Sequence, residues 1–235
     1  TKRADALYLT QPMGGTRVET YSWARTLDEA RRVAAYIRKQ NFPPKSQIAM
    51  LSKNCAQFFI TDLAIWMAGH VSVALYPTLN ADTVKYILEH SESKMLFVGK
   101  LDTWDEMKPG VPDDLPQVSY PLSPDSVRED DNVTHWNDIL ADNEPIEDSP
   151  TRDADDLAII VYTSGSTGRP KGVMHSFRTM GAAARGVIKA LGLGEERVLS
   201  YLPLAHVFER FAIETMTLIP GGQVFLAESE QTFAQ

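Results

Sequence analysis

This sequence of 235 residues lacks disulfide-forming cysteine pairs, long hydrophobic runs and any excess of positive charge. Its single cysteine, Cys55, cannot form an intramolecular disulfide, which favours a reducing, cytoplasmic location. The N-terminal residues contain no apolar core of signal-peptide length. The most apolar stretch, residues 58–77, is interrupted by Asp62, Gly69 and His70. It therefore predicts a helix followed by a strand, and no transmembrane segment is expected.

The net charge is −8 at neutral pH, and acidic residues are concentrated in one segment. Residues 102–156 contain 17 Asp and Glu against 3 Lys and Arg, a local charge of −14 that leaves +6 on the rest of the chain. A globally acidic protein is not expected to bind nucleic acid. The mildly basic remainder is compatible with an anionic ligand.

Outside that segment, helical and strand patterns alternate along the chain. Thr26 and Glu29 form an expected capping box, and Asn80 is an expected N-cap. The patterns predict helices over 26–40, 56–69, 81–90, 177–192 and 208–219, and strands over 47–52, 71–76, 94–99, 157–162, 197–203 and 222–227. This alternation is typical of parallel βα units, so the predicted fold class is α/β with layered parallel sheets.

The acidic segment, residues 102–156, also holds seven of the fourteen prolines. Its composition predicts an irregular, solvated surface excursion with one short helical turn over residues 133–140.

The most informative stretch is IIVYTSGSTGRPKGVMHSF, residues 159–177. Residues 163–167 supply four hydroxyls within five residues, from Thr163, Ser164, Ser166 and Thr167. Gly165, Gly168 and Gly172 permit a close backbone approach, and Lys171 adds a cation. Hydroxyls and backbone N–H groups beside one lysine can surround a polyphosphate. Arg169 and Pro170 separate Gly168 from Lys171, so this is not a Walker A motif. A flexible Ser/Gly linker is the competing interpretation.

The run YTSGSTGRPKG, residues 162–172, resembles the phosphate-binding signature of the adenylate-forming superfamily, which includes acyl-CoA synthetases, luciferases and nonribosomal-peptide adenylation domains. The resemblance implies that residues 1–235 form the N-terminal part of a large AMP-binding domain, incomplete at the C-terminus and without the C-terminal lid domain. It also implies that this phosphate loop contacts ATP through Thr163, Ser164, Gly165, Ser166, Thr167, Gly168 and Lys171. Lys171 would have a catalytic role, and the Thr163 hydroxyl would approach Mg²⁺.

A second motif, SYLPLAHVFER over residues 200–210, contains a lone histidine after a strand. On the residues alone, a core or capping role is the favoured interpretation of His206, and Arg210 is expected to pair with Glu209 or Glu214 on a solvated helix face. The motif resembles the long-chain fatty acyl-CoA synthetase branch, as does HVSVALYPTL over residues 70–79. That resemblance implies that His206 is a catalytic residue beside the acyl carboxylate.

The implied activity is ATP-dependent activation of a long-chain fatty acid to an acyl-adenylate and then to acyl-CoA, with ATP, Mg²⁺ and coenzyme A. Residues 200–235 contain none of the family's later adenine, ribose and lysine motifs. We therefore expect a fragment that is inactive alone and whose exposed strand edge favours a homo-oligomer. Peripheral membrane contact and acyl chain length stay open. The alternatives are an amino-acid adenylation domain, a fatty acyl-AMP ligase, or a non-catalytic nucleotide-binding module.

Overall fold

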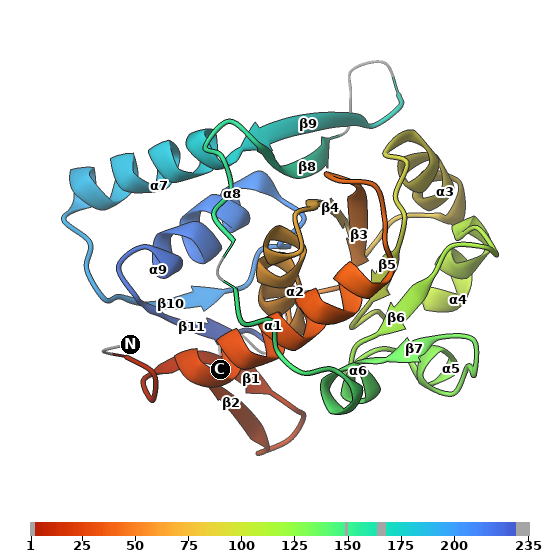
Figure 1. The fold of residues 1–235 in the computed structure, drawn as a ribbon, viewed down its shortest axis with the longest axis horizontal. Helices are drawn as coiled ribbons and strands as arrows, with labels where there is room; N and C mark the ends of the chain where they lie inside the picture. Colours follow the sequence, from red (N-terminus) through yellow and green to blue (C-terminus); the bar gives the residue numbers. More distant parts are fainter. Residues whose placement is uncertain (1–2, 149, 164–167, 229–235) are drawn as a thin grey trace.

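Two β-sheets and the helices between and beside them form the fold (Figure 1). The computed structural model describes residues 3–148, 150–163 and 168–228. The larger sheet has the strand order β7-β6-β5-β3-β4-β8-β9, and the smaller has the order β10-β11-β1-β2. The larger sheet is built from β3 (Gln47–Leu51), β4 (Val71–Leu75), β5 (Leu96–Val98), β6 (Gln117–Ser119), β7 (Thr134–His135), β8 (Leu157–Thr163) and β9 (Lys171–Ser176). The smaller contains β1 (Leu7–Pro12), β2 (Val18–Ser22), β10 (Arg197–Ser200) and β11 (Gln223–Leu226).

Most neighbouring strands run parallel, which confirms the predicted α/β class. The antiparallel pairs are β1 with β2 and β8 with β9. All six expected strands are present, as β3, β4, β5, β8, β10 and β11. The pairing of β1 with β11 brings opposite ends of the chain together, which local patterns cannot reveal.

Helices α1 (Trp23–Lys39) and α2 (Ala56–Met67) lie between the two sheets. Their apolar side chains share one core with Leu9 of β1, Met50 of β3 and Val224 of β11. Helix α3 (Ala81–His90) covers the opposite face of the larger sheet, where Val84 and Leu88 pack against Leu51 and Val73. Burial on both faces explains why β3 and β4 are almost wholly apolar. The Asn80 side chain accepts from the Thr83 N–H, as its N-cap assignment predicted.

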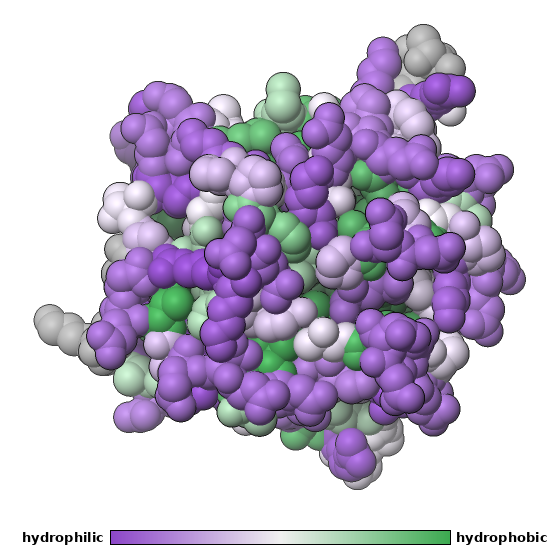
Figure 2. Space-filling model, turned by 45° about the vertical axis from the view of Figure 1, so that its right-hand side comes forward, coloured by the Kyte–Doolittle hydropathy of each residue, from purple (hydrophilic) through white to green (hydrophobic). Residues whose placement is uncertain are grey.

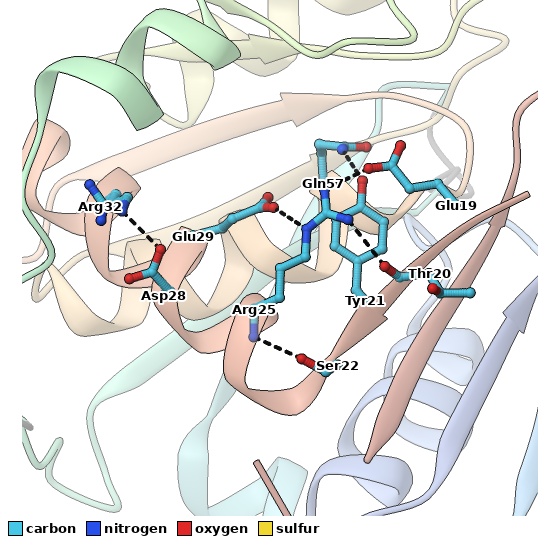
Figure 3. A network of polar contacts seen from close by, with 9 residues as sticks. All are labelled: Glu19, Thr20, Tyr21, Ser22, Arg25, Asp28, Glu29, Arg32 and Gln57. Carbon is cyan, nitrogen blue, oxygen red and sulfur yellow. Dashed lines mark hydrogen bonds and ion pairs between the residues drawn. The ribbon is translucent and has the colours of Figure 1, made fainter. Parts of the chain in front are cut away.

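The expected capping box at the start of α1 is wrong. The helix begins one turn earlier, and the Ser22 hydroxyl accepts from the backbone N–H of Arg25 at 3.1 Å (Figure 3). Thr26 is therefore inside the helix, and Glu29 instead accepts from Arg25 Nε at 2.8 Å. The same guanidinium also pairs with Glu19. This network joins the first turn of α1 to β2.

The expectation of an irregular excursion over residues 102–156 is also wrong, although the one helical turn expected within it, over residues 133–140, is confirmed by a helix that begins at Trp136. The segment supplies β6 and β7 to the larger sheet, together with α4 (Trp104–Met107), the 3₁₀ turn η1 (Lys108–Gly110), α5 (Asp125–Arg128) and α6 (Trp136–Asp142). Trp104 and Met107 pack beneath α3, and Tyr120 and Trp136 enter the core shared with α1 and α2. Most acidic side chains of this segment are exposed to solvent, as its composition indicates. Its buried aromatic residues pack into the core and hold the segment in a regular structure, which the composition does not indicate.

The last expected helix consists of three consecutive pieces. They are α8 (Val207–Glu209), a π-helical turn η2 (Arg210–Thr215) and α9 (Met216–Leu218). Helix α7 (Phe177–Leu191) packs beside this segment and ends at Gly192, whose φ of +64° closes the helix in the left-handed conformation.

Hydrophilic residues surround separate apolar patches on the face seen in Figure 2. Among the helices of the described ranges, none has the length and apolarity that crossing a membrane requires. Strands β9 and β10 stand at the edges of their sheets, and Met174 of β9 exposes 69% of its surface.

Candidate functional site

Strands β8 and β9 form an antiparallel hairpin that carries the proposed phosphate loop. Thr163, the last residue of β8, is the Cα partner of Lys171, the first residue of β9, and both are exposed. Gly168 has a φ of +84°, the left-handed region that glycine readily adopts. Ser164, Gly165, Ser166 and Thr167 lie outside the described residues. Strand β9 was not expected, because the glycine and lysine at its start were interpreted as part of the loop.

A cavity of about 380 Å³ lies between the base of this hairpin and the start of α8. Its walls include Thr163 and Pro170 from the hairpin, His206 and Val207 from α8, and Tyr76 after β4. The two sequence motifs, far apart in the chain, therefore meet at one cavity. Lys171 and Gly168 are not among the residues that line it.

The cavity lies where β4 and β8 end, at the carboxyl edge of the parallel part of the larger sheet. Ligands of open α/β sheets bind in crevices at this edge. Its lining is largely apolar, with the Thr163 hydroxyl, the His206 imidazole and the phenols of Tyr76 and Tyr162 as polar groups. Burial raises the pKa of Tyr76, so its phenol is neutral near pH 7.

His206 is the N-cap of α8. Its Nδ1 accepts a hydrogen bond from the backbone N–H of Phe208 at 3.1 Å, while the side chain is exposed at the cavity wall. This contact fixes the orientation of the imidazole and leaves Nε2 as the nitrogen with which His206 could contact a ligand. The two interpretations of His206, capping residue and ligand contact, are thus compatible in one side chain.

Behind His206, Glu209 is buried and accepts hydrogen bonds from the Ser200 hydroxyl at 2.7 Å and the Tyr201 N–H at 3.1 Å. Burial raises the pKa of Glu209 to about 7. The expectation of a solvated face for Arg210 is wrong. Arg210 is fully buried and pairs with Asp62 of α2 as well as Glu214.

The donors at the hairpin suit a nucleotide phosphate better than a protein-held metal. The Thr163 hydroxyl and the Lys171 ammonium stand on neighbouring strands at the loop base, and Gly168 permits a close backbone approach. Within the described ranges, no group of three or more His, Cys, Asp or Glu could hold a metal ion. A magnesium ion bound mainly by phosphates and water needs only one or two protein oxygens, so Thr163 fits that role.

Sequence reasoning missed two residues beside this hairpin. Tyr162 was interpreted only as the end of a strand, yet it lines the cavity and bonds to His90 of α3. Tyr162 belongs to the resemblance motif, which was the available signal. His90 lies in no motif, and nothing in the sequence distinguished it.

The family comparison matches the whole chain. The sequence model described as "AMP-binding enzyme" covers residues 1–235. Fatty acyl-CoA synthetase A of Dictyostelium discoideum is 32% identical over 218 residues, which are 86% of this chain and 32% of that protein. Long chain acyl-CoA synthetase 5 of Arabidopsis thaliana is 34% identical over 187 residues, covering 73% of this chain and 28% of that protein.

Among solved structures, an anthranilate CoA ligase, AuaEII, in complex with anthranoyl-AMP matches with a TM-score of 0.83 and 18% identity. The match covers 96% of this chain and 42% of that structure, and at this identity it supports the fold alone. The chain spans about a third of the length of the curated relatives described here.

Proposed function

This chain belongs to the AMP-binding enzyme family, and we propose that its protein activates a fatty acid with ATP and transfers the acyl group to coenzyme A. The observation that carries this proposal is the meeting of Thr163 and His206 at one cavity. One residue comes from the motif that resembles the family's phosphate loop, and the other from the motif that resembles its acyl-carboxylate site.

In the proposed first step, the fatty acid carboxylate attacks the α-phosphorus of ATP and displaces pyrophosphate. A carboxylate is already ionised at neutral pH, so this step needs no general base. Positioning and neutralisation of charge are then the main tasks of the protein. His206 Nε2 would orient the carboxylate, and Nδ1 is occupied by its bond to the Phe208 N–H.

The hairpin would bind the phosphates. Lys171 supplies a mobile positive charge, and Thr163 to Gly168 supply hydroxyl and backbone N–H donors. Lys171 is exposed and does not line the cavity, which suits contact with the departing pyrophosphate more than contact with the acid. When bound, Mg²⁺ would neutralise phosphate charge, and the Thr163 hydroxyl is the proposed protein ligand.

The long-chain substrate is the finer part of the proposal. It is supported by the LPLAHVFER and YPTL sequences, by the names of the two curated relatives and by the apolar lining of the cavity. The rival within the family is an enzyme for another acid or acceptor, such as an amino-acid adenylation domain or a fatty acyl-AMP ligase. A non-catalytic nucleotide-binding module is the alternative outside catalysis.

We further propose that the 235 residues alone do not complete the reaction, since they correspond to about a third of each curated relative. A cytoplasmic location is proposed from the single, buried Cys55. Self-association is proposed from the unpaired edges of β9 and β10 among the described strands. A single monomeric species in sedimentation velocity at all concentrations would contradict self-association.

The test of function is ATP–pyrophosphate exchange by the complete gene product, with acetate, octanoate, palmitate and a set of amino acids. Palmitate-dependent exchange that is lost in Lys171→Ala supports the proposal. Lys189→Ala, which removes an exposed lysine of α7, is the matched control and should retain exchange. Exchange with an amino acid identifies the rival. No exchange with any acid leaves the non-catalytic module as the better account.

His206 has its own pair of variants. His206→Asn retains an N-cap side chain for α8 but lacks Nε2, so it separates ligand contact from capping. We expect both His206→Asn and His206→Ala to raise the KM for palmitate, with only His206→Ala lowering the thermal midpoint. A normal KM for palmitate in His206→Asn would reduce His206 to a capping residue.

A further inference from the structure

The last turn of α3 contacts Tyr162 of β8 on one side of the phosphate loop and Arg169, which precedes β9, on the other. The Tyr162 hydroxyl lies 2.8 Å from His90 Nδ1, and the two rings meet edge to face with centroids 5.8 Å apart. The His90 ring also lies 5.3 Å from the ring of Tyr86. The guanidinium of Arg169, which follows Gly168, lies 5.7 Å from the centroid of that same Tyr86 ring. Tyr86 and His90, one turn apart on α3, therefore contact one residue on each side of the phosphate loop.

Tyr162 is confined from the opposite side as well. It is the Cα partner of Gly172 in the hairpin and exposes only 3% of its surface. A Cβ at Gly172 would lie 3.3 Å from Tyr162 Cζ and 3.0 Å from Ile160 Cγ2, so only glycine leaves ordinary room for the ring there. The phenol is thus enclosed between α3 and the backbone of β9, and its position depends on both.

The Tyr162 phenol takes part in this hydrogen bond as an uncharged group at neutral pH. Burial raises the pKa of Tyr162 to about 12, so the phenol keeps its proton. A protonated phenol can donate to Nδ1 or accept from Nδ1–H, according to the tautomer of His90. Since Tyr162 precedes Thr163 directly, this bond fixes the end of β8, and the Thr163–Lys171 pairing carries the restraint to the start of β9.

We propose that His90 and Tyr162 are positioning residues that hold Thr163 and Lys171 at the spacing required for ATP phosphates. The catalytic part rests on the proposed function, whereas the restraint on the hairpin does not. A contact that merely stabilised the fold would lower the thermal midpoint of unfolding without altering the response to ATP specifically.

The restraint is tested on the 235-residue chain by limited trypsin digestion. Trypsin does not cleave the Arg169–Pro170 bond, so cleavage after Lys171 reports opening of the hairpin where β9 begins. His90→Phe keeps an aromatic ring and removes the nitrogen, whereas His90→Asn keeps a hydrogen-bonding amide near the position of Nδ1. Tyr36→Phe is the control, because it removes a phenol that donates to Thr134 Oγ1 at 3.2 Å, away from the hairpin.

We expect cleavage after Lys171 to accelerate about three- to tenfold in His90→Phe and in Tyr162→Phe, as loss of one hydrogen bond allows. His90→Asn should stay within about twofold of the parent chain, and Tyr36→Phe should leave this site unchanged. The proposal is overturned if His90→Phe cleaves at the parent rate or if Tyr36→Phe gives the same acceleration.

The catalytic part is tested in the complete gene product by pyrophosphate exchange. His90→Phe should raise the KM for ATP by a similar factor, leave the KM for the acid unchanged, and be rescued by His90→Asn. An unchanged KM for ATP beside faster cleavage overturns the positioning role. If no acid supports exchange in the parent protein, the proposed function fails, while the cleavage experiment still decides the restraint on the hairpin.

Discussion

Replacement of Arg210 should strongly destabilise this protein, because the residue is the only cation in a buried cluster with two acids. Arg210 Nη2 lies 2.8 Å from Asp62 Oδ1, and Arg210 Nε lies 3.1 Å from Glu214 Oε2. None of the three side chains exposes more than 1% of its surface. Burial raises the pKa of Asp62, an effect that Arg210 opposes, and burial together with the Asp62 charge raises that of Glu214 well above its usual range. We infer that Glu214 holds a proton at neutral pH.

The expected loss of stability follows from the contacts that remain after Arg210→Met. Methionine retains an apolar stem beside Phe58, whose ring lies 5.4 Å from the guanidinium, but Asp62 loses its counter-charge. Breaking a buried ion pair by removing one partner costs about 3–5 kcal/mol. An independent route agrees: protonating an aspartate of ordinary pKa near 3.9 at pH 7 costs about 4 kcal/mol, at about 1.4 kcal/mol per pH unit. A loss of this size is a large part of the ~5–15 kcal/mol that stabilises a typical domain.

Urea unfolding followed by tryptophan fluorescence measures this loss, and its pH dependence distinguishes the cause. In Arg210→Met the folded-state pKa of Asp62 rises further, so the folded protein binds a proton that the unfolded chain releases above about pH 4. The loss of unfolding free energy in Arg210→Met, relative to the parent protein, should therefore be largest near pH 7. It should decrease by about 1.4 kcal/mol per pH unit as the pH falls toward 5.

Two comparisons complete the experiment. Arg178→Met removes an arginine whose ion pair with Asp155 is exposed, so it should leave the free energy of unfolding almost unchanged. The triple variant Asp62→Leu, Arg210→Met, Glu214→Leu leaves no buried charge in the cluster and should recover most of the lost stability. If Arg210→Met costs no more than Arg178→Met, or if its deficit does not depend on pH, the buried-charge reasoning is refuted.

Four further substitutions test other parts of the fold. Burial raises the pKa of Glu209 to about 7, so this residue should lower the unfolding free energy by about 1.4 kcal/mol per pH unit as the pH rises from about 4.5 to 7. In a pH series of urea titrations, Glu209→Gln should reduce the slope of the parent protein by that amount. Gly110→Ala would place Cβ 2.0 Å from the Ala81 carbonyl oxygen and should cost about 1–3 kcal/mol or more, whereas Gly186→Ala, which meets no atom within 4 Å inside α7, should gain about 0.5–1 kcal/mol by the same assay. Ser22→Ala should cost about 0.5–2 kcal/mol, and a thermal midpoint equal to that of the parent would remove Ser22 as the working N-cap of α1.

Sequence patterns predicted the larger elements because their signals are local. The helix over residues 81–90 begins at its cap Asn80, and the apolar strands β3, β4 and β8 are buried on both faces as their composition indicates. The start of α1 was wrong because Ser22 and Thr26 are both good N-caps, and only the tertiary contacts of Arg25 with β2 favour the earlier one.

Segment 102–156 could not be predicted for a different reason. Strands β6 and β7 contain three and two residues, too few to display a period. Their pairing depends on β5, and their burial depends on Tyr120 and Trp136 meeting α1 and α2. An acidic, proline-rich composition correctly indicates that much of a segment is exposed to solvent. It does not indicate whether a few large side chains of that segment are buried in the core.

The candidate site likewise contains some residues that the sequence predicts and others that only the structure reveals. Thr163, Lys171 and His206 could be selected from the sequence because a reactive site requires unusual residue types, and those types cluster in short motifs. Arg210 was assigned to the surface because buried arginine is rare unless it is paired, and its partner Asp62 lies on a distant helix. His90 and Tyr86 belong to an ordinary amphipathic helix and reach the hairpin only through the packing of α3 against the larger sheet. A residue that acts by holding another needs no distinctive chemistry of its own. Such residues are therefore found from geometry, and variants at His90 test whether this geometry has a function.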